Sequence, residues 1–538
     1  MNPKISIYRY GELVCETNGV PGESLLKRIG AAGVFLDSPC GGKGKCGKCL
    51  VRLSPGGEKV CACRISVEGD MSVYLPEDME MKIAGAGGQY PHNAECRMEN
   101  AEIGDGSYEV GSADTPEFRI PNLISGAARR VGVAVDIGTT TVVAHLIDLD
   151  TSIRIATASG VNAQRTYGAD VISRIQYCSD NGHDTLTRLI REQLSSLILE
   201  ACAASGTCAN DIGYIAIAAN TIMEHLAAGY SPVGMGAVPF TPVSLFGEEM
   251  SAWDNLPVSK TAKVYFAPAV SSYVGSDITA GMYAAKLEGT SCPAVYLDIG
   301  TNGEIVLKSG DTYYCCATAA GPAFEGAEIT MGMAAINGAI NHVKWDDGLK
   351  YTIIGGGAPR GLCGSGLLDA LAVLLETGAV DETGRMLGIN DIEHNIADCI
   401  GEVDGKNGFW LTRDDGGVYM SASDIRKLQL AKSAIAAGIQ TLLRYTEISE
   451  EQVGLFVLAG GFGSFMDQYS AARIGLFPKI FLPVSQTLGN TAGEGAALAL
   501  CSEAARASLN SIRARCKYIE LSANPIFNEQ FMEQMMFP

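Results

Sequence analysis

The sequence has little positive charge and no long apolar run. Its 538 residues include 40 Lys and Arg against 60 Asp and Glu, a formal charge of −20, which argues against a nucleic-acid partner because such a partner requires a basic face. No apolar run approaches the roughly 18 residues of a membrane-spanning helix, and the chain starts without the pattern of a signal peptide. The 17 cysteines would suggest disulfides in a short secreted chain, but this chain is long. We therefore expect a cytoplasmic protein without a membrane partner.

The P-loop pattern G-x-x-x-x-G-K-[ST] is also absent, but two similar acidic turns are present. DIGTTT at residues 136–141 and DIGTNG at residues 298–303 each follow an apolar run and lead into a second one, which predicts a strand, a tight turn and a strand. Glycine allows close approach of a ligand, while amide N–H groups and Thr hydroxyls donate to phosphate oxygens. An Asp entering the turn can hold a hydrated Mg²⁺. A single copy is also expected in an ordinary hairpin turn that binds no ligand. Two copies that face one another would hold a magnesium-bound nucleoside triphosphate.

A third glycine cluster, LAGGFG at residues 458–463, follows another apolar run. In this order, the three motifs resemble the actin-like (ASKHA) ATPase superfamily of hexokinase and of acetate and sugar kinases. The resemblance implies a two-lobed, RNase H-like α/β ATPase whose late glycine pair packs under adenosine. The Ala- and Gly-rich segments 276–287 and 491–505 are expected to be the helices that this superfamily crosses between its lobes.

These motifs give candidate roles to individual residues. Asp136 and Asp298 are expected to hold the waters of Mg²⁺. Glu304 and Glu325 are candidates for ordering the attacking water, with a buried cap as the alternative for Glu325. Gly460 and Gly461 are expected to lie against the adenosine of ATP. The expected phosphate contacts are Gly138, Thr139, Thr140, Thr141, Gly300, Thr301, Asn302 and Gly303.

The N-terminal cysteines predict a metal centre. Cys40, Cys46 and Cys49 lie on a glycine-rich loop, and Cys63 follows Cys49 by 14 positions, which is typical of a plant-type [2Fe–2S] cluster with its fourth ligand on the next strand. Zinc is the alternative, although a single C-x₂-C departs from the usual paired knuckles. Cys61 competes with Cys63, because alternate side chains of a strand share a face. Resemblance to ferredoxins, in which the fourth ligand follows Leu-Ala, favours Cys63.

The predicted architecture is a multidomain α/β chain. Residues 1–83 are expected to form a β-grasp, ferredoxin-like α+β domain, and residues 84–129, rich in Gly, Ala, Glu and Asn, a linker. Residues 130–538 form the ATPase, with lobes at about 130–290 and 291–538. Within the first domain we expect a hairpin of Ile5 to Arg9 with Glu12 to Glu16, a helix over 23–32, and strands at 50–53 and 72–75.

This pairing of domains resembles one family, the reductive activators of corrinoid-dependent enzymes. Further strings carry the resemblance: NTIMEHL at 220–226, VGSDI at 274–278, AGPAFEGA at 320–327, GLCGSGLLD at 361–369, and the segments 424–432 and 531–538. The resemblance implies an ATP-dependent one-electron donor of anaerobic metabolism. Its partners would be an upstream electron donor and a corrinoid protein or corrinoid-dependent methyltransferase, whose cob(II)alamin it returns to cob(I)alamin. A homodimer is left open.

Two other classes remain open. A small-molecule kinase with an accessory ferredoxin would use the same ATPase fold. An activator of a radical dehydratase also joins an actin-like ATPase to iron and sulfur, although its [4Fe–4S] cluster is held inside the ATPase. Lys43, Lys45 and Lys48 surround the cysteine loop, where they would dock an acidic partner or tune the cluster, or serve only to keep the loop solvated.

Overall fold

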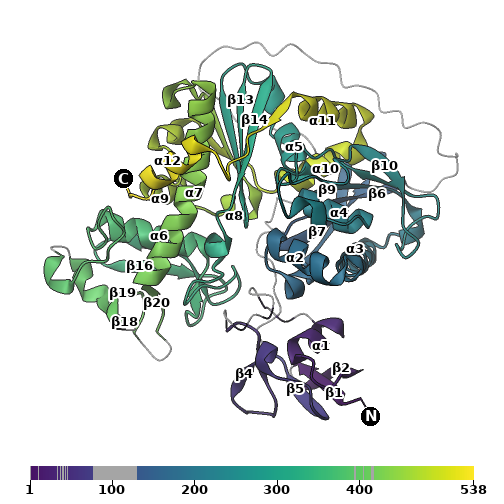
Figure 1. Ribbon diagram of the computed structural model, residues 1–538, viewed down its shortest axis with the longest axis horizontal. Helices are drawn as coiled ribbons and strands as arrows, with labels where there is room; N and C mark the ends of the chain where they lie inside the picture. Colours follow the sequence, from purple (N-terminus) through teal and green to yellow (C-terminus); the bar gives the residue numbers. More distant parts are fainter. Residues whose placement is uncertain are drawn as a thin grey trace.

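The computed structural model describes residues 2–9, 11–32, 34, 36, 38, 42, 44, 47–76, 130–392, 395–403, 405–413 and 417–538. Figure 1 shows two lobes side by side and a small N-terminal domain below them. Cys40, Cys46, Lys43, Lys45 and the predicted linker 84–129 lie outside the described residues.

The N-terminal domain is a five-stranded sheet in the order β2-β1-β5-β3-β4, with one helix packed on it. Its elements are β1 Lys4–Arg9, β2 Glu12–Asn18, α1 Leu25–Ala31, β3 Leu50–Arg52, β4 Lys59–Cys61 and β5 Met71–Tyr74. β1 pairs antiparallel with β2 and parallel with β5. The predicted hairpin, helix and two strands are thus confirmed, with α1 starting after its N-cap Ser24 rather than at Glu23.

One expectation in this domain is wrong. The strand expected to carry the fourth thiol ends at Cys61, and Cys63 lies in the 3-10 helix η1 Ala62–Arg64. The two side chains therefore do not alternate along one strand, and the argument that both could share a strand face does not apply.

The two lobes repeat one topology. The first sheet has the order β10-β11-β9-β6-β7-β8 and the second the order β22-β21-β12-β13-β14-β23. In each, a three-stranded antiparallel meander is joined by a parallel strand on its first member. The strands are β6 Val131–Ile137, β7 Thr141–Asp148, β8 Ile153–Val161, β9 Ile212–Ala219, β10 Glu248–Ser251, β11 Lys263–Phe266, β12 Ala294–Ile299, β13 Gly303–Ser309, β14 Thr312–Thr318, β21 Leu455–Ala459, β22 Ser485–Thr487 and β23 Cys516–Tyr518.

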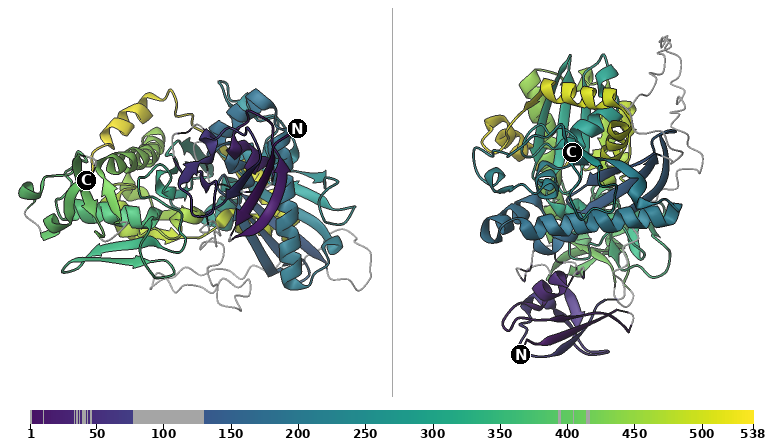
Figure 2. Two further views of the ribbon diagram at one scale, coloured as in Figure 1. Left: turned by 90° about the horizontal axis from the view of Figure 1, so that it is seen from below. Right: turned by 90° about the vertical axis from the view of Figure 1, so that its right-hand side faces the viewer.

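Helices cover both sheets, and two small sheets extend the second lobe (Figures 1 and 2). The helices are α2 Val171–Asn181, α3 Asp184–Ser205, α4 Thr221–Ala228, α5 Ser276–Ala284, α6 Gly364–Glu376, α7 Ala422–Thr446, α8 Gly460–Gly463, α9 Gln468–Arg473, α10 Thr491–Cys501, α11 Glu503–Arg515 and α12 Pro525–Glu533. The small sheets are β15 Ala339–Trp345 with β16 Leu349–Ile353 and β17 Gly361–Leu362, and β18 Ile400–Val403 with β19 Lys406–Trp410 and β20 Tyr419–Ser421. In the described part of the chain, no helix combines the length and apolar character needed to cross a bilayer.

Helices α5 and α10 exchange partners between the lobes. α5 follows the first sheet in sequence, yet its Ile278 and Met282 pack on residues of the second sheet. α10 follows the second sheet, yet Ala496 and Leu500 pack on the first. The predicted helix over 491–505 is broken at Ser502, which ends α10 and caps α11. The expected crossing of two small-residue helices is confirmed.

The crossing brings the backbones of α5 and α10 into contact. A Cβ built at Gly495 would overlap the carbonyl of Ala280, and one at Gly281 would overlap the Tyr296 hydroxyl. Glycine is required here by space, because the atom that a side chain would meet at Gly495 belongs to the backbone and cannot rotate away.

The C-terminal tail is held on α7 by polar side chains of that helix. The buried Lys432 ammonium donates to the carbonyl of Met536 at 2.7 Å, and Ser433 donates to that of Gln534 at 2.8 Å. The segments 424–432 and 531–538, singled out in the sequence, therefore contact one another. Burial lowers the pKa of Lys432 to about 8.

We predict that Gly495→Ala lowers the stability of the protein by about 1–3 kcal/mol, the usual cost of overpacking a tight contact. Denaturant unfolding of the purified variant measures this. Gly213→Ala is the matched control, because a Cβ there meets no atom within 4 Å; equal midpoints for the two variants would contradict the close crossing.

We also predict a pH effect from Lys432. The folded state holds the proton less tightly than the unfolded state, so stability rises as pH increases from about 8 toward the unfolded pKa of 10.5. Thermal midpoints recorded between pH 7 and 10 should show this rise in the wild type and a smaller one in Lys432→Met. Lys479→Met, an exposed lysine of the same lobe, should keep the wild-type profile.

Candidate functional site

Two hairpins meet where the lobes face one another. Asp136 is the next-to-last residue of β6, and Asp298 is the next-to-last residue of β12. Each lies two positions before the glycine of its DIG motif. The first turn is tight, since a Cβ at Gly138 would lie 2.9 Å from the carbonyl oxygen of Thr141. In the second turn the Gly300 amide donates to the carbonyl of Asn302 at 2.9 Å. The predicted hairpins are confirmed, although both aspartates belong to the strands rather than to the turns.

Four carboxylates lie close together in this region, with Glu304 buried and Asp136, Asp277 and Asp298 partly buried. Burial first, and then the charges of neighbouring acids, raise the pKa of Asp136 to about 7 and that of Asp277 to about 8. Burial raises the pKa of Asp298 to about 6, and the pKa of Glu304 also lies well above its usual value. No Lys or Arg side chain of the described residues shifts the pKa of any of these four carboxyl groups. A bound cation would therefore stabilise the charged form of all four.

These acids fit a hydrated Mg²⁺ better than a fully protein-bound ion. In the described part of the chain, no three His, Cys, Asp or Glu side chains are arranged to hold a metal ion. Mg²⁺ usually keeps several waters and binds one or two carboxylates together with substrate phosphates. Asp136 and Asp298 could hold such an ion through its waters.

The N-terminus of α10 reaches this acidic group. Asn490 caps α10 by accepting from the Gly493 amide, and its Nδ2 donates to Asp136 Oδ2 at 2.8 Å. Beside it, the hydroxyls of Tyr296 and Thr491 lie 2.8 Å apart, and Tyr296 also contacts Asp298 at 3.4 Å. The crossing of α5 and α10 thus places polar groups of both helices beside the two aspartates.

Glu325 joins the two hairpins. The Thr140 hydroxyl lies 3.0 Å from Glu325 Oε2, and the Thr301 hydroxyl donates to Oε1 at 2.9 Å. The two hydroxyls lie 3.3 Å from one another. Glu325 is partly exposed, so it is not a buried cap. Its carboxylate occupies the position where donors from both lobes converge.

Arg174 holds the first hairpin from behind. Its fully buried guanidinium donates to the carbonyls of Thr139 and Gly168 and to Met223 Sδ. Burial lowers its pKa to about 9. Asn162 adds a second contact, because its Nδ2 donates to the Gly138 carbonyl at 2.8 Å.

The late glycine pair lies beside the second hairpin. A Cβ at Gly460 would overlap Asp298 Oδ1, and its φ of +86° favours glycine. A Cβ at Gly461 meets nothing within 4 Å, so the first turn of α8 is open above this glycine.

The remaining predicted phosphate contacts lie at the ends of the two hairpins. Asn302 hydrogen-bonds Glu304, and Gly303 packs on Ile435 of α7. Thr141 starts β7.

Two of the four predicted cluster ligands can be placed. Cys63 hydrogen-bonds Cys49, and Cys61 is close enough to act on the same thiol. A Cβ at Gly42 would lie 3.9 Å from Cys63 Cβ, so the cysteine loop returns to this pair. The arrangement fits a cluster held by Cys49 and Cys63. Lys48 donates to the carbonyl of Gly332 in the second lobe at 2.8 Å. This contact within the chain differs from the expected roles of the lysines in docking a partner, tuning the cluster or solvating the loop.

Several residues at the site have no counterpart in the prediction. Asp277, Asn490 and Arg174 carry much of its electrostatics. Asp277 lies inside the string at 274–278, at the start of a helix, and an acid in such a position was the available signal. Asn490 directly precedes a small-residue helix as an N-cap. Arg174 has no local signal, because only the fold brings it behind Thr139.

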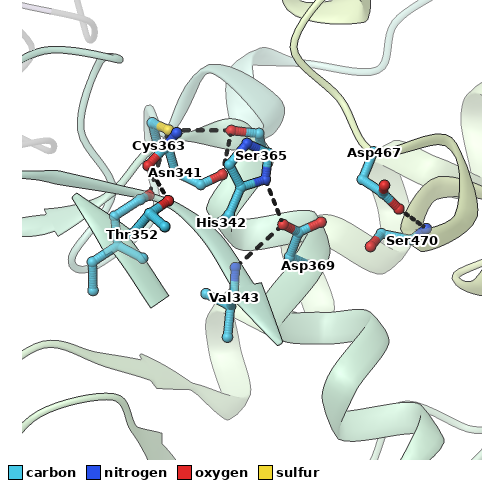
Figure 3. A network of polar contacts seen from close by, with 10 residues as sticks. Asn341, His342, Val343, Thr352, Cys363, Ser365, Asp369, Asp467 and Ser470 are labelled. Carbon is cyan, nitrogen blue, oxygen red and sulfur yellow. Dashed lines mark hydrogen bonds and ion pairs between the residues drawn. The ribbon is translucent and has the colours of Figure 1, made fainter. Parts of the chain in front are cut away.

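His225 and Cys363, which lie in the strings at 220–226 and 361–369, make structural contacts. His225 is buried between the Thr221 carbonyl and the amides of Val243 and Ser244. Figure 3 shows Cys363 in a buried network at the start of α6, 3.4 Å from the Ser365 hydroxyl, beside the His342–Asp369 pair. A surface hollow of about 790 Å³ between α3 and residues 252–255 contains none of the predicted site residues.

Comparisons with known proteins agree with this architecture. Two family descriptions match the chain, "RACo middle region" over residues 131–290 and "C-terminal domain of RACo the ASKHA domain" over residues 293–538. The chain is 31% identical to the corrinoid activation enzyme RamQ of Eubacterium limosum, over 98% of both chains. It is 25% identical to a [Co(II) methylated amine-specific corrinoid protein] reductase of Methanosarcina barkeri, over 67% of this chain and 68% of the relative.

A solved structure shares the whole fold. The reductive activator for corrinoid, iron-sulfur protein matches with a TM-score of 0.71 and 28% identity, over 100% of this chain and 98% of that chain. The likeness covers the N-terminal domain as well as both lobes. The chain therefore belongs to the RACo family of reductive activators and corrinoid activation enzymes.

Proposed function

We propose that this protein is an ATP-dependent reductive activator that gives one electron to the cob(II)alamin of a partner corrinoid protein or methyltransferase and so restores cob(I)alamin. The observation that carries the proposal is the meeting of the two hairpins, 161 residues apart, at one carboxylate: Thr140 and Thr301 both contact Glu325. Such a meeting of donors from two lobes suits a triphosphate held between them.

The nucleotide half of the proposal assigns roles by position. Asp136 and Asp298 hold the waters of Mg²⁺, the two hairpins offer amides and hydroxyls to phosphate, and Gly460 with Gly461 gives adenosine room beside α8. Glu304 is fully buried with a raised pKa, so it acts on charge in the site rather than on water. Glu325 is the better candidate for orienting a water, because it faces both hairpins.

The redox half rests on the cysteines. Cys49 and Cys63, with Cys40 and Cys46 of the same loop, would hold a [2Fe–2S] cluster, which supplies single electrons. Gly42, Gly44 and Gly47 have positive φ values, so the loop can turn sharply around a bulky group without side-chain strain.

ATP is needed because the electron moves uphill. Plant-type clusters lie near roughly −400 mV, and an uphill gap on the order of 200 mV costs about 5 kcal/mol for one electron, since ~59 mV is a tenfold change. Tight binding of ATP alone cannot offset this gap. The nucleotide must favour one arrangement of the lobes over another, and that arrangement must bind the corrinoid partner differently.

The proposal predicts that Asp136→Asn and Asp298→Asn each weaken Mg·ATP binding by about 10–100-fold, the usual effect of losing an outer-sphere carboxylate. Calorimetric titration measures this. Neither variant should be less stable, because each replaces a buried acid by a neutral group of the same shape. Asp184→Asn, at a fully exposed carboxylate, should bind like the wild type; unchanged affinity in all three would refute the nucleotide assignment.

A second prediction concerns the cysteines. After anaerobic reconstitution, Cys49→Ser and Cys63→Ser should lose the visible absorption and the EPR signal of a reduced [2Fe–2S] cluster, while Mg·ATP binding persists. Cys208→Ser, at an exposed cysteine without metal spacing, is the control. A full cluster in Cys63→Ser together with its loss in Cys61→Ser would instead assign the fourth ligand to Cys61.

The function itself is tested by mixing the reduced protein, ATP and candidate corrinoid proteins under anaerobic conditions and following the cobalt absorption bands. Conversion of cob(II) to cob(I) should require ATP, the cluster cysteines and both aspartates. ATP consumption with sugars or acetate and no protein acceptor would indicate a small-molecule kinase. A [4Fe–4S] EPR signal would indicate a dehydratase activator.

A further inference from the structure

The N-terminal domain contacts both lobes. A Cβ built on Gly30 of α1 would lie 2.8 Å from Thr166 Cγ2 and 3.8 Å from the Tyr167 hydroxyl, so this helix packs closely on residues of the 3-10 helix η3 Ala163–Tyr167 of the first lobe. Lys48 reaches the other lobe, where it donates to the Gly332 carbonyl at 2.8 Å. Figure 1 places this domain beneath α2, and the right-hand view of Figure 2 also shows it at the end of the molecule.

In each lobe, the element that the N-terminal domain contacts also packs on a hairpin of the candidate nucleotide site. In the first lobe, η3 is capped by Asn162, whose side chain donates to the Gly138 carbonyl and whose amide donates to the Thr140 carbonyl, both at 2.8 Å. The hairpin contacts the N-cap of η3, and α1 packs on the last two residues of η3. The turn at 138–140 is thus connected to Thr166 through this one short helix.

In the second lobe, Gly332 is packed against the segment that carries Glu325. A Cβ at Gly332 would overlap the carbonyl of Gly326, which directly follows Glu325. The same segment is fixed on its outer side, because the Thr330 amide and hydroxyl donate to Asp424 at 2.9 and 3.0 Å. A movement of Glu325 is thus transmitted inward to Gly332 and to the acceptor of Lys48.

Phosphate and Glu325 compete for the same protons. A Thr hydroxyl has one proton to donate, and in the structure the hydroxyls of Thr140 and Thr301 lie within hydrogen-bonding distance of Glu325. A phosphate that accepts hydrogen bonds from these hydroxyls withdraws them from the carboxylate. Glu325 then loses its contacts to Thr140 and Thr301, so the segment between Glu325 and Gly332 is held at Thr330 but no longer at Glu325.

We propose, on the basis of the function proposed above, that Gly30, Thr166 and Lys48 form a seat for the N-terminal domain across the two lobes, and that Mg·ATP binding loosens this seat. The electron-carrying domain is held against the ATPase in one arrangement of the lobes and freed toward the corrinoid partner in the other. Because coupling between two sites is reciprocal, any change that unseats the domain must tighten nucleotide binding by the same factor.

The test uses the full chain and two variants that disturb the seat from opposite lobes. Gly30→Ala introduces the Cβ that meets Thr166, and it favours helix α1 itself, since Ala has the higher helix propensity. Lys48→Met removes only the donor to Gly332. Gly69→Ala, where a Cβ meets nothing within 4 Å, and Lys59→Met, at an exposed position of β4, are matched controls in the same domain.

Two measurements report whether the N-terminal domain is held in its seat, and neither requires a corrinoid protein. Calorimetric titration with Mg²⁺ and a non-hydrolysable ATP analogue measures nucleotide affinity. Gly30→Ala and Lys48→Met should each bind the analogue at least about 5-fold more tightly than the wild type, which is within the usual range of coupling between sites. Small-angle scattering should show that the analogue increases the radius of gyration of the wild type, and that Lys48→Met is expanded without it. Both controls should behave like wild type.

A rescue variant separates the contact from general damage. Thr166→Ser removes the Cγ2 atom that the new methyl group meets, so Gly30→Ala with Thr166→Ser should return to wild-type affinity and size. Wild-type nucleotide affinity in both Gly30→Ala and Lys48→Met, together with an unchanged radius of gyration on adding the analogue, would overturn the seat but leave the proposed function intact. Failure of the wild type to bind the analogue at all would overturn both.

Discussion

The contact between the backbones of α5 and α10 is the constraint on which the site depends. The two helices can cross this closely only because glycine stands at 495, while glycine at 281 leaves room for the side chains of Tyr296 and Thr491. Each helix begins beside the acidic group, α5 with Asp277 and α10 with the cap Asn490. Because α5 packs on the second sheet and α10 on the first, any rotation of one lobe against the other must pass through this crossing. Small residues allow helices to slide past one another, so the contact that closes the site can also act as its hinge.

The acidic group explains why such a hinge would respond to a ligand. Burial raises the pKa of Asp298 to about 6, that of Asp136 to about 7 and that of Asp277 to about 8, so a bound cation would stabilise the charged form of these acids. Asp136 belongs to the first sheet and Asp298 to the second, whereas Asp277 is carried by the crossing helix. A cation shared by these acids favours the arrangement that brings the two sheets together, and the free energy of that preference is available to drive a conformational change.

The parts of the site that could be predicted from the sequence are those encoded by neighbours in the chain. The hairpins at 136–141 and 298–303 are recognisable because apolar runs flank a turn, and the small-residue helices because composition alone marks them. Asn490 lies 354 residues from Asp136, and Arg174 lies 35 residues from Thr139, so no local pattern relates them. The position of Cys63 in a 3-10 turn was missed for another reason: Val60 and Cys61 favour a strand, and the chain leaves it by a turn in which the Ile65 amide donates to the Ala62 carbonyl. The site roles assigned to individual residues remain predictions.

The size of the contact between the N-terminal domain and the lobes is suited to control by a nucleotide. The described contacts include the Lys48 hydrogen bond to Gly332 and the packing of Gly30 on Thr166 and Tyr167, and a hydrogen bond from a charged donor contributes about 1.5–3 kcal/mol. A ligand with a micromolar dissociation constant binds with roughly 8 kcal/mol, and the part of this free energy by which it prefers one arrangement of the lobes can displace such a contact. A larger interface would hold the domain in place whatever the nucleotide did, and a domain with no contact would carry no information about the lobes. If the N-terminal domain carries an electron as proposed, it must collect the electron at one place and deliver it at another, which requires a contact of this intermediate strength.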